Sequence, residues 1–217
     1  MKTLSVLSCK GGTGKTTLAL HLAVAAQRVG RTVLVADLDR QRSAIDWKRE
    51  RDEARPCVEE AKPGSLFTIQ QAATRLGSDL MIIDTASSRE EDSAYAIRCA
   101  DLCLIVLRPN FLDLKAVVAS AQAVLNQRKQ GIFVVNQATT GVAAMGEIMA
   151  ALRPYGFPVA PVIRQRNAYS QGFGGGRTAQ EIEPEGPAAG EMAALWSYLS
   201  DMIWPHVEAE PLMALSA

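Results

Sequence analysis

Short apolar runs alternate along the chain with longer segments in which apolar residues recur at helical spacing. Runs of four to six residues rich in Val, Ile and Leu are typical of strands buried on both faces of a parallel sheet. Such strands are predicted at Leu4–Leu7, Thr32–Ala36, Leu80–Ile83, Leu102–Leu107, Ile132–Val135 and Val159–Ile163. Helices are predicted over residues 16–29, about 43–54, 66–76, 90–99, 112–129, 142–153 and 188–203. This alternation predicts an α/β fold: a single doubly wound, mainly parallel sheet with helices on both faces.

A glycine-rich loop joins the first predicted strand to the first predicted helix, over residues 8–17 (SCKGGTGKTT). Glycines here let the backbone curl so that successive N–H groups point at one anion, and the helix start adds its positive dipole end. The spacing is that of a phosphate-binding loop, in which Lys15 reaches the β- and γ-phosphates and the Thr16 hydroxyl ligates Mg²⁺.

A second lysine, Lys10, stands at the front of the same loop. Lys-Gly-Gly-Thr-Gly-Lys-Thr is a deviant Walker A motif, and on it the chain resembles the ParA/MinD family of ATPases. The resemblance implies that Lys10 reaches across a nucleotide-sandwich dimer to the partner's phosphates, as an arginine finger does. It also implies Lys10 and Lys15 as catalytic residues. The implied nucleotide-binding residues are Lys10, Gly11, Gly12, Thr13, Gly14, Lys15, Thr16, Thr17 and Asn136.

Acidic residues follow two of the predicted strands. In the family a switch segment Asp-x-Asp-Pro-Gln ends the second strand, and here Asp39 takes the place of its water-positioning acid, with a contact to the metal shell. This chain has Arg40 where relatives usually have proline. For Asp37, a role in capping the next helix fits as well as a functional one. Asp84 ends the third strand as the Walker B acid, so Thr16, Asp39 and Asp84 are the predicted Mg²⁺ residues.

Two polar residues near the ends of later strands have both structural and functional interpretations. Asp113 lies in the family's Pro-x-x-x-Asp-Leu segment and supports the dimer or the switch there, but as an acid in the first turn of a helix it needs no further role. Asn136 can present a donor and an acceptor to the adenine edge, as its family position suggests, or serve as a plain turn asparagine.

Arg164 and Arg166 follow the last predicted strand. In the partition relatives this region leads to a basic surface that contacts DNA, so both are candidate contacts to DNA phosphates, together with Arg153 and Arg177. The plain alternative is a set of solvated arginines.

Charge is distributed unevenly, although the whole chain of 217 residues is formally neutral. Residues 1–177 hold all 23 Lys and Arg against 16 acids, whereas residues 178–217 hold seven acids and no Lys or Arg. Any basic surface must therefore come from the body of the chain. We divide the chain into an ATPase domain, residues 1–203, and an acidic C-terminal tail, residues 204–217.

The four cysteines form no C-x-x-C pair, so reduced thiols are expected. With no apolar run of eighteen residues and no room for a signal peptide before the first strand, a cytoplasmic protein is expected.

Without an N-terminal helix-turn-helix, the likeness is to short ParA-type partition proteins. It implies ATP with Mg²⁺ as cofactors, an ATP-bound homodimer, non-specific binding to nucleoid DNA, and release when a ParB-like or other cargo adaptor stimulates hydrolysis.

Three other functions are alternatives, but each would need a feature that this sequence does not show. A MinD-like membrane ATPase would need a basic amphipathic tail, which this acidic, proline-containing tail is not. An iron–sulfur reductase would need bridging cysteines, but Cys99 and Cys103 resemble core residues. An ATP-dependent amidation enzyme would need a second substrate pocket that the sequence does not reveal.

Overall fold

The central element is a six-stranded, fully parallel sheet in the order β3-β2-β4-β1-β5-β6. We describe residues 1–86, 90–139 and 142–205 of a computed structural model. The order of the strands reverses at β1, which places the loop after β1 at the point where bound ligands are expected in open α/β sheets. The strands are β1 (Lys2–Leu7), β2 (Val33–Asp37), β3 (Cys57–Glu60), β4 (Leu80–Asp84), β5 (Leu102–Leu107) and β6 (Gln130–Val135).

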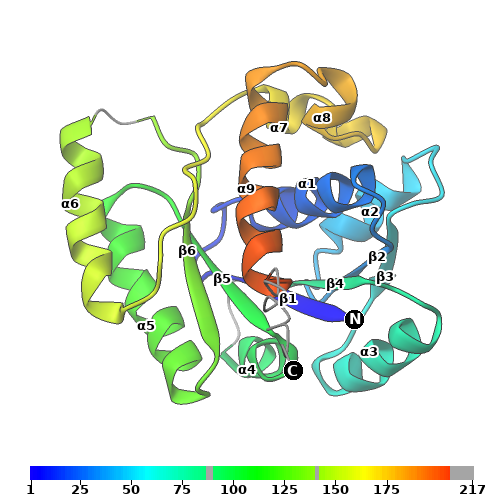
Figure 1. Cartoon of the computed structure of the whole chain (residues 1–217), viewed down its shortest axis with the longest axis horizontal. Coiled ribbons are helices and arrows are strands. Elements are labelled where there is room, and N and C mark those ends of the chain that lie inside the picture. Colours follow the sequence, from blue (N-terminus) through cyan, green and yellow to red (C-terminus); the bar gives the residue numbers. More distant parts are fainter. Residues whose placement is uncertain (87–89, 140–141, 206–217) are drawn as a thin grey trace, which may run out of the picture.

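Helices cover both faces of this sheet, as predicted (Figure 1). One face carries α1 (Lys15–Arg28), α2 (Ser43–Arg49) and α9 (Pro187–Ile203). The other carries α3 (Leu66–Arg75), α4 (Glu90–Cys99), α5 (Phe111–Asn126) and α6 (Val142–Leu152). Two short helices, α7 (Ala168–Gln171) and α8 (Ala179–Ile182), lie beside the N-terminal end of α9.

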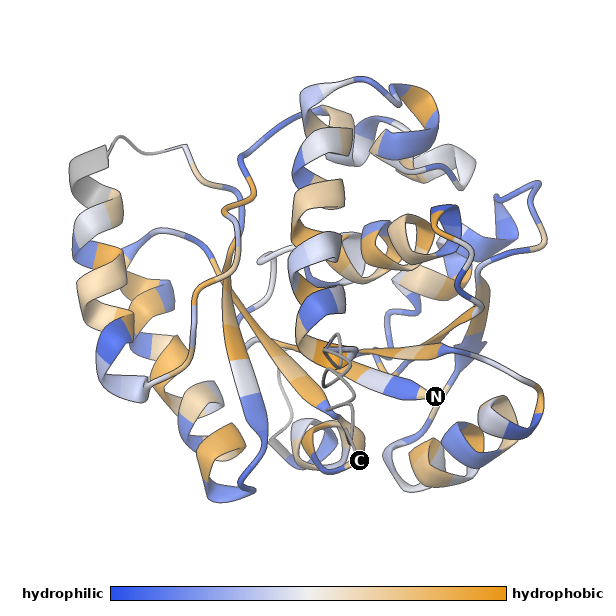
Figure 2. Cartoon of the chain, viewed as in Figure 1, coloured by the Kyte–Doolittle hydropathy of each residue, from blue (hydrophilic) through white to orange (hydrophobic). Residues whose placement is uncertain are grey.

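Each central strand contributes to two hydrophobic cores because successive side chains point to opposite faces. In β4, Leu80 and Ile82 pack under α1 and α9, whereas Met81 and Ile83 pack against α3 and α4. Figure 2 shows the central strands as apolar along most of their length, with hydrophilic residues gathered in the loops and on the outer helix surfaces. Burial on both faces explains why continuous apolar runs marked these strands correctly.

The predicted last strand, Val159–Ile163, is wrong. Two isolated bridges, between Phe133 and Val159 and between Ala138 and Arg164, and a few main-chain hydrogen bonds join this region to β6 and the residues after it, without forming a regular ladder. Pro158 and Pro161 are the physical reason, because proline has no N–H to donate to a strand ladder. The segment follows β6 as an irregular chain, held by these main-chain bonds as far as Gln165 and by side-chain contacts beyond that residue.

The region after β2 also differs from the prediction. Helix α2 ends at Arg49 instead of about residue 54, because Lys48 Nζ donates to the carbonyls of Glu53 and Ala54, at 2.7 and 2.9 Å, and folds the chain back. The edge strand β3 was missed because only Val58 of its four residues is buried.

The last described residues pack against the domain. Trp204 lies edge-on to Trp196 of α9, with ring centroids 6.1 Å apart, and the Arg31 guanidinium lies 4.4 Å from the Trp204 ring centroid. The rest of the predicted acidic tail, residues 206–217, lies outside the described residues. Among the described helices, none is long and apolar enough to span a bilayer.

Candidate functional site

The glycine-rich loop lies between the end of β1 and the start of α1, at the carboxyl edge of the sheet. Gly14 has φ of 85°, a left-handed conformation, and a Cβ added there would lie 2.6 Å from Nδ2 of Asn136. Glycine is therefore required at this position for both backbone and space. No side chain of the described residues caps the first turn of α1, so its N–H groups and dipole are available for an anion.

Lys15 is the first residue of α1 and is nearly buried, at 7% exposure. Its Nζ donates to the Lys10 carbonyl at 3.4 Å. Burial lowers the pKa of Lys15, while the charges of Asp84 and Asp39 raise it. The structure thus brings the predicted phosphate lysine together with both predicted metal acids.

Asp84 ends β4 next to β1 and is completely buried. Neither carboxylate oxygen has a hydrogen-bond partner of good geometry among the described residues. Burial raises the pKa of Asp84 to about 7, and the nearby Thr16 side chain and the Lys15 charge act in the opposite direction. An unpartnered buried carboxylate beside a threonine hydroxyl fits a hard, oxygen-seeking cation such as Mg²⁺, which would satisfy both oxygens directly or through its waters.

Asp37, the last residue of β2, and Asp39, just beyond it, have different surroundings. The Asp37 carboxylate accepts hydrogen bonds from the N–H groups of Asp39, Ala44 and Ile45, at 2.9, 3.2 and 3.3 Å. Its oxygens therefore anchor the first turn of α2, which favours the capping interpretation of this residue. Asp39 is half-buried, and its Oδ1 accepts only from the Gln41 N–H, at 3.0 Å, among described donors.

Asp113 organises the other side of the loop. Its carboxylate is 2% exposed and accepts from Arg108 Nε at 2.9 Å, while Lys10 Nζ lies 3.5 Å from its Oδ1. Burial alone would raise the pKa of Asp113. The hydrogen bonds from Arg108 and the charge of Lys10 outweigh burial and bring the pKa below its usual range. The start of α5 is capped by Asn110 instead, whose Oδ1 accepts from the Asp113 N–H at 2.9 Å. The helix-start explanation of Asp113 is therefore incomplete, because its side chain is used to hold two cations.

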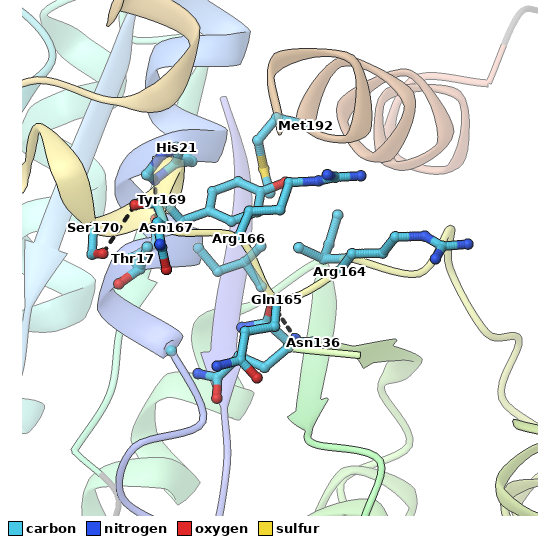
Figure 3. A pocket seen from close by; sticks show the side chains of 14 residues that line it. Thr17, His21, Asn136, Arg164, Gln165, Arg166, Asn167, Tyr169, Ser170 and Met192 are labelled. Carbon is cyan, nitrogen blue, oxygen red and sulfur yellow. Dashed lines mark hydrogen bonds between the residues drawn. The ribbon is translucent and has the colours of Figure 1, made fainter. Parts of the chain in front are cut away.

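A pocket of about 270 Å³ opens beside the loop, on the side of α1 and α9. We call it the loop-side pocket. One wall is formed by residues 163–167, 169 and 170, and the remaining lining includes Gly14, Thr17, His21 and Asn136. Figure 3 shows how these side chains gather around the pocket, with the His21 ring beside Tyr169. Asn136 donates from Nδ2 to the Thr13 carbonyl at 2.8 Å, and its Oδ1 accepts from the Gln137 N–H. This asparagine therefore braces the loop, and its suggested contact with adenine stays a prediction.

Arg164 and Arg166, both predicted to contact DNA, line this pocket but have different surroundings. Arg166 is paired with Glu191 of α9, with Nη2 and Oε1 2.7 Å apart. Arg164 is exposed, and Figure 3 shows its side chain extending away from α1. No ion pair of its guanidinium is found among the described residues.

Sequence reasoning missed three residues of this region: His21, Tyr169 and Glu191. His21 is fully buried, with Nδ1 2.7 Å from the Thr17 carbonyl and Nε2 accepting from the Ala179 N–H at 3.0 Å. Its partners lie 4 and 158 residues away. Only the contact with Thr17 could be expected from the sequence, because residues four apart lie on the same face of a helix.

Residues 4–178 match the family described as "CobQ/CobB/MinD/ParA nucleotide binding domain". The chain belongs to this family. With the deviant Walker A loop in place, it is a ParA/MinD-type ATPase with ATP and Mg²⁺ as cofactors. The predicted family and the predicted fold are confirmed.

Known proteins resemble this ParA/MinD-type ATPase over different lengths. Maintenance of carboxysome distribution protein A from Halothiobacillus neapolitanus is 26% identical over 204 residues, covering 87% of this chain and 91% of that protein. The protein of the same name from Gloeobacter kilaueensis is 33% identical over 121 residues, and the match spans only about half (54%) of each chain.

In fold, the ATPase resembles the septum site-determining protein MinD from Pyrococcus horikoshii, solved with Mg-ADP. The TM-score is 0.75 at 19% identity, with 93% of this chain and 96% of that chain covered. At this identity the likeness concerns the fold alone.

In this ATPase the sheet brings the loop from Lys10 to Thr17 to the same edge as Asp39 and Asp84, while the Lys10 side chain turns to Asp113. Their individual roles remain predictions. Cys103, considered for a bridging cluster, is buried within β5, and Cys99 is the last residue of α4.

Proposed function

We propose that this protein is a positioning ATPase. It dimerises when ATP binds, holds nucleoid DNA without sequence preference, and is released when a cargo-bound partner stimulates hydrolysis. The proposal rests above all on Lys10, which stands at the front of the phosphate loop with 32% of its side chain exposed and can reach a second copy. Its cation would then act on the partner's terminal phosphate, where charge accumulates in the transition state.

Apolar side chains beside Lys10 support a face-to-face dimer. Phe111 and Leu112 are 67% and 63% exposed, and both directly precede Asp113, the residue that holds Lys10. Large exposed apolar side chains next to a polar site are typical of surfaces that a partner covers. A second copy docked over the loop would bury them.

We assign the loop-side pocket to the nucleoside of ATP. It adjoins Gly14 and Thr17 of the loop, so a nucleotide whose phosphates lie at the start of α1 can extend into it. Asn136, in contact with both the loop and the pocket, would then face the base as predicted.

Exposed arginines on the body of the domain supply the DNA surface. Arg153, Arg164 and Arg177 are all exposed, and no ion pair of theirs is found among the described residues. A few such contacts bind DNA weakly in one copy. Two copies joined by ATP double the number of phosphate contacts, so affinity rises steeply.

The cargo adaptor is a ParB-like or comparable protein, and the site of action is the nucleoid in the cytoplasm. Two relatives are named for carboxysome distribution, which makes a large protein assembly a candidate cargo alongside a plasmid or chromosome.

Retention on random duplex DNA tests the proposal. The wild type with Mg²⁺ and a non-hydrolysable ATP analogue should be retained at moderate salt and should elute earlier with ADP. Lys15→Ala should lose the nucleotide-dependent part of retention, whereas Lys2→Ala, which removes a lysine at the opposite edge of the sheet, should keep it. Equal retention of wild type with and without the analogue would overturn the proposal.

A further inference from the structure

The wall of the loop-side pocket is held by a single carboxylate from α9. Glu191 Oε1 accepts from Arg166 Nε at 3.0 Å and from Arg166 Nη2 at 2.7 Å. Glu191 Oε2 accepts from the Tyr169 hydroxyl at 2.8 Å and from the Arg164 N–H at 3.2 Å. Both oxygens are therefore used, and each of the three donor residues lines the pocket.

We propose that Glu191 is a positioning residue for nucleotide binding, which sets the shape of the nucleoside site without touching the nucleotide. Three independent points of the wall, at residues 164, 166 and 169, converge on this one side chain. The inference rests on the assignment of the loop-side pocket to the nucleoside.

The far end of the wall depends on Glu191, because the main-chain bonds to β6 and the residues after it reach only as far as Gln165. Pro158 and Pro161 prevent a strand here, and the main-chain bonds that continue from β6 end with the Gln165 N–H on the Ala138 carbonyl. Beyond that point the polar ties of Arg166 and Tyr169 to the domain run through Glu191 and the Ala188 carbonyl, while the Tyr169 ring packs against His21 and the core. Hydrogen bonds from a guanidinium to a carboxylate that is only 17% exposed are charge-assisted and stronger than bonds between neutral groups.

The charge of Glu191 also determines what Arg166 can do. The Glu191 carboxylate neutralises the Arg166 charge and holds its Nε and Nη2 against the pocket wall. Arg166, which sequence reasoning placed on the DNA surface, therefore serves the pocket, and Arg164 is the member of the pair left for solvent or DNA.

The effect of Glu191 should be confined to the nucleoside half of the ligand. The phosphates are bound by the loop and Lys15, none of which contacts Glu191. Removing the carboxylate should thus weaken ATP while leaving inorganic tripolyphosphate, which carries no nucleoside, bound as before.

Equilibrium binding of Mg-ATP and of Mg-tripolyphosphate to the full chain tests this inference. Glu191→Ala should raise the Kd for ATP by about tenfold and leave the Kd for tripolyphosphate within about twofold of wild type. Glu191→Gln keeps an acceptor for Tyr169 and Arg164, and it should recover much of the loss. Glu185→Ala, which removes the same charge from an exposed position, is the matched control and should bind both ligands like wild type.

The outcomes separate the inference from the assignment on which it rests. If wild type binds ATP no better than tripolyphosphate, the pocket is not the nucleoside site. If wild type prefers ATP and folded Glu191→Ala keeps that preference, the positioning role is wrong. Equal weakening of both ligands would also overturn it, since that result indicates a general loss of structure. Should Glu191→Ala fail to fold, Tyr169→Phe, which removes one of the three ties, must raise the Kd for ATP alone by a smaller factor.

Discussion

Lys10 Nζ lies 3.5 Å from Oδ1 of Asp113, a carboxylate that is also bound by Arg108. The Lys10 ammonium therefore lies outside the phosphate cradle of its own chain. Lys10 can leave without stranding a buried charge, because Arg108 still neutralises Asp113. The contact therefore holds the lysine in the single copy at little cost to its release when a second copy docks.

Lys10→Ala should separate nucleotide binding from turnover. We expect its Kd for ATP to stay within about twofold of wild type, whereas DNA- and partner-stimulated hydrolysis falls at least about 100-fold, as for loss of an arginine finger. The measurement is ATP hydrolysis as a function of protein concentration, where wild type should show a rise in specific activity that the variant lacks. Lys2→Ala is the control. Stimulated hydrolysis at the wild-type rate in Lys10→Ala would show that Lys10 does not act on the partner's terminal phosphate.

Asp84→Asn should stabilise the protein without ligand while abolishing its Mg²⁺ site. Burial raises the pKa of Asp84 to about 7 from an ordinary value of 3.8, so keeping it charged at pH 8 costs on the order of 4 kcal/mol. Because the new amide is still unpartnered, we expect a net gain of about 2 kcal/mol, or roughly 4–8 °C in Tm.

The gain in stability from Asp84→Asn should depend on pH. Below about pH 7 the folded wild type takes up a proton at Asp84 that the unfolded chain, with an ordinary pKa of 3.8, does not, so the penalty shrinks steadily as the pH falls from 7 towards 3.8. Thermal melts of both proteins without nucleotide at pH 8 and pH 5.5 should therefore show a difference that shrinks with acidification. If the difference in Tm stays constant with pH, or if the variant is less stable at pH 8, the buried charge of Asp84 does not destabilise the wild type.

His21 should make the domain sensitive to acid. Burial lowers the pKa of His21 to about 4 from 6.5, so between these values the unfolded chain binds a proton that the folded chain does not. Stability is therefore lost as the pH falls through 6.5, up to about 3 kcal/mol once it reaches 4. Urea unfolding at pH 7.5 and pH 5 should show a smaller loss for His21→Gln than for wild type. Because the other histidine, His206, is present in both proteins, an identical pH dependence would exclude His21 as the source.

Arg164→Ala should weaken DNA binding by the ATP-bound dimer and reduce its dependence on salt. Loss of one phosphate contact per copy should lower the slope of log K against log salt by about two for the dimer. Retention is to be measured at saturating ATP analogue, since Arg164 also lines the loop-side pocket. Arg75→Ala, at the exposed end of α3, is the matched loss of charge and should keep the wild-type slope. An unaltered slope for Arg164→Ala would move the DNA surface elsewhere.

The phosphate loop and the acids at the strand ends could be read from the sequence because their geometry is local. A strand, a glycine turn and a helix in succession fix where Lys15 and Thr16 lie, whatever the rest of the chain does. Parallel strands then bring Asp84 to the same edge as the loop, since their carboxyl ends coincide. The family resemblance added Lys10, whose role depends on a second copy.

The last predicted strand failed for an equally physical reason. Val159–Ile163 has the apolar character of a buried strand, and apolar character reports burial, not hydrogen bonding. The prolines at 158 and 161 have no N–H to offer a regular ladder, and the segment keeps only a few main-chain bonds to β6 on an irregular path over the core.

The sequence by itself determined most of the alternation of strands and helices, the phosphate loop and the place of Asp84 at the end of a strand, because each is set by residues close together in the chain. Only the tertiary structure decided that Glu191 holds Arg166 and Tyr169, that His21 bonds a residue 158 positions away, and that Lys10 rests on Asp113. Such contacts join segments with no shared periodicity. They exist only once the hydrophobic cores have set the distances between helices and sheet, and it is these contacts that shape the walls of the site.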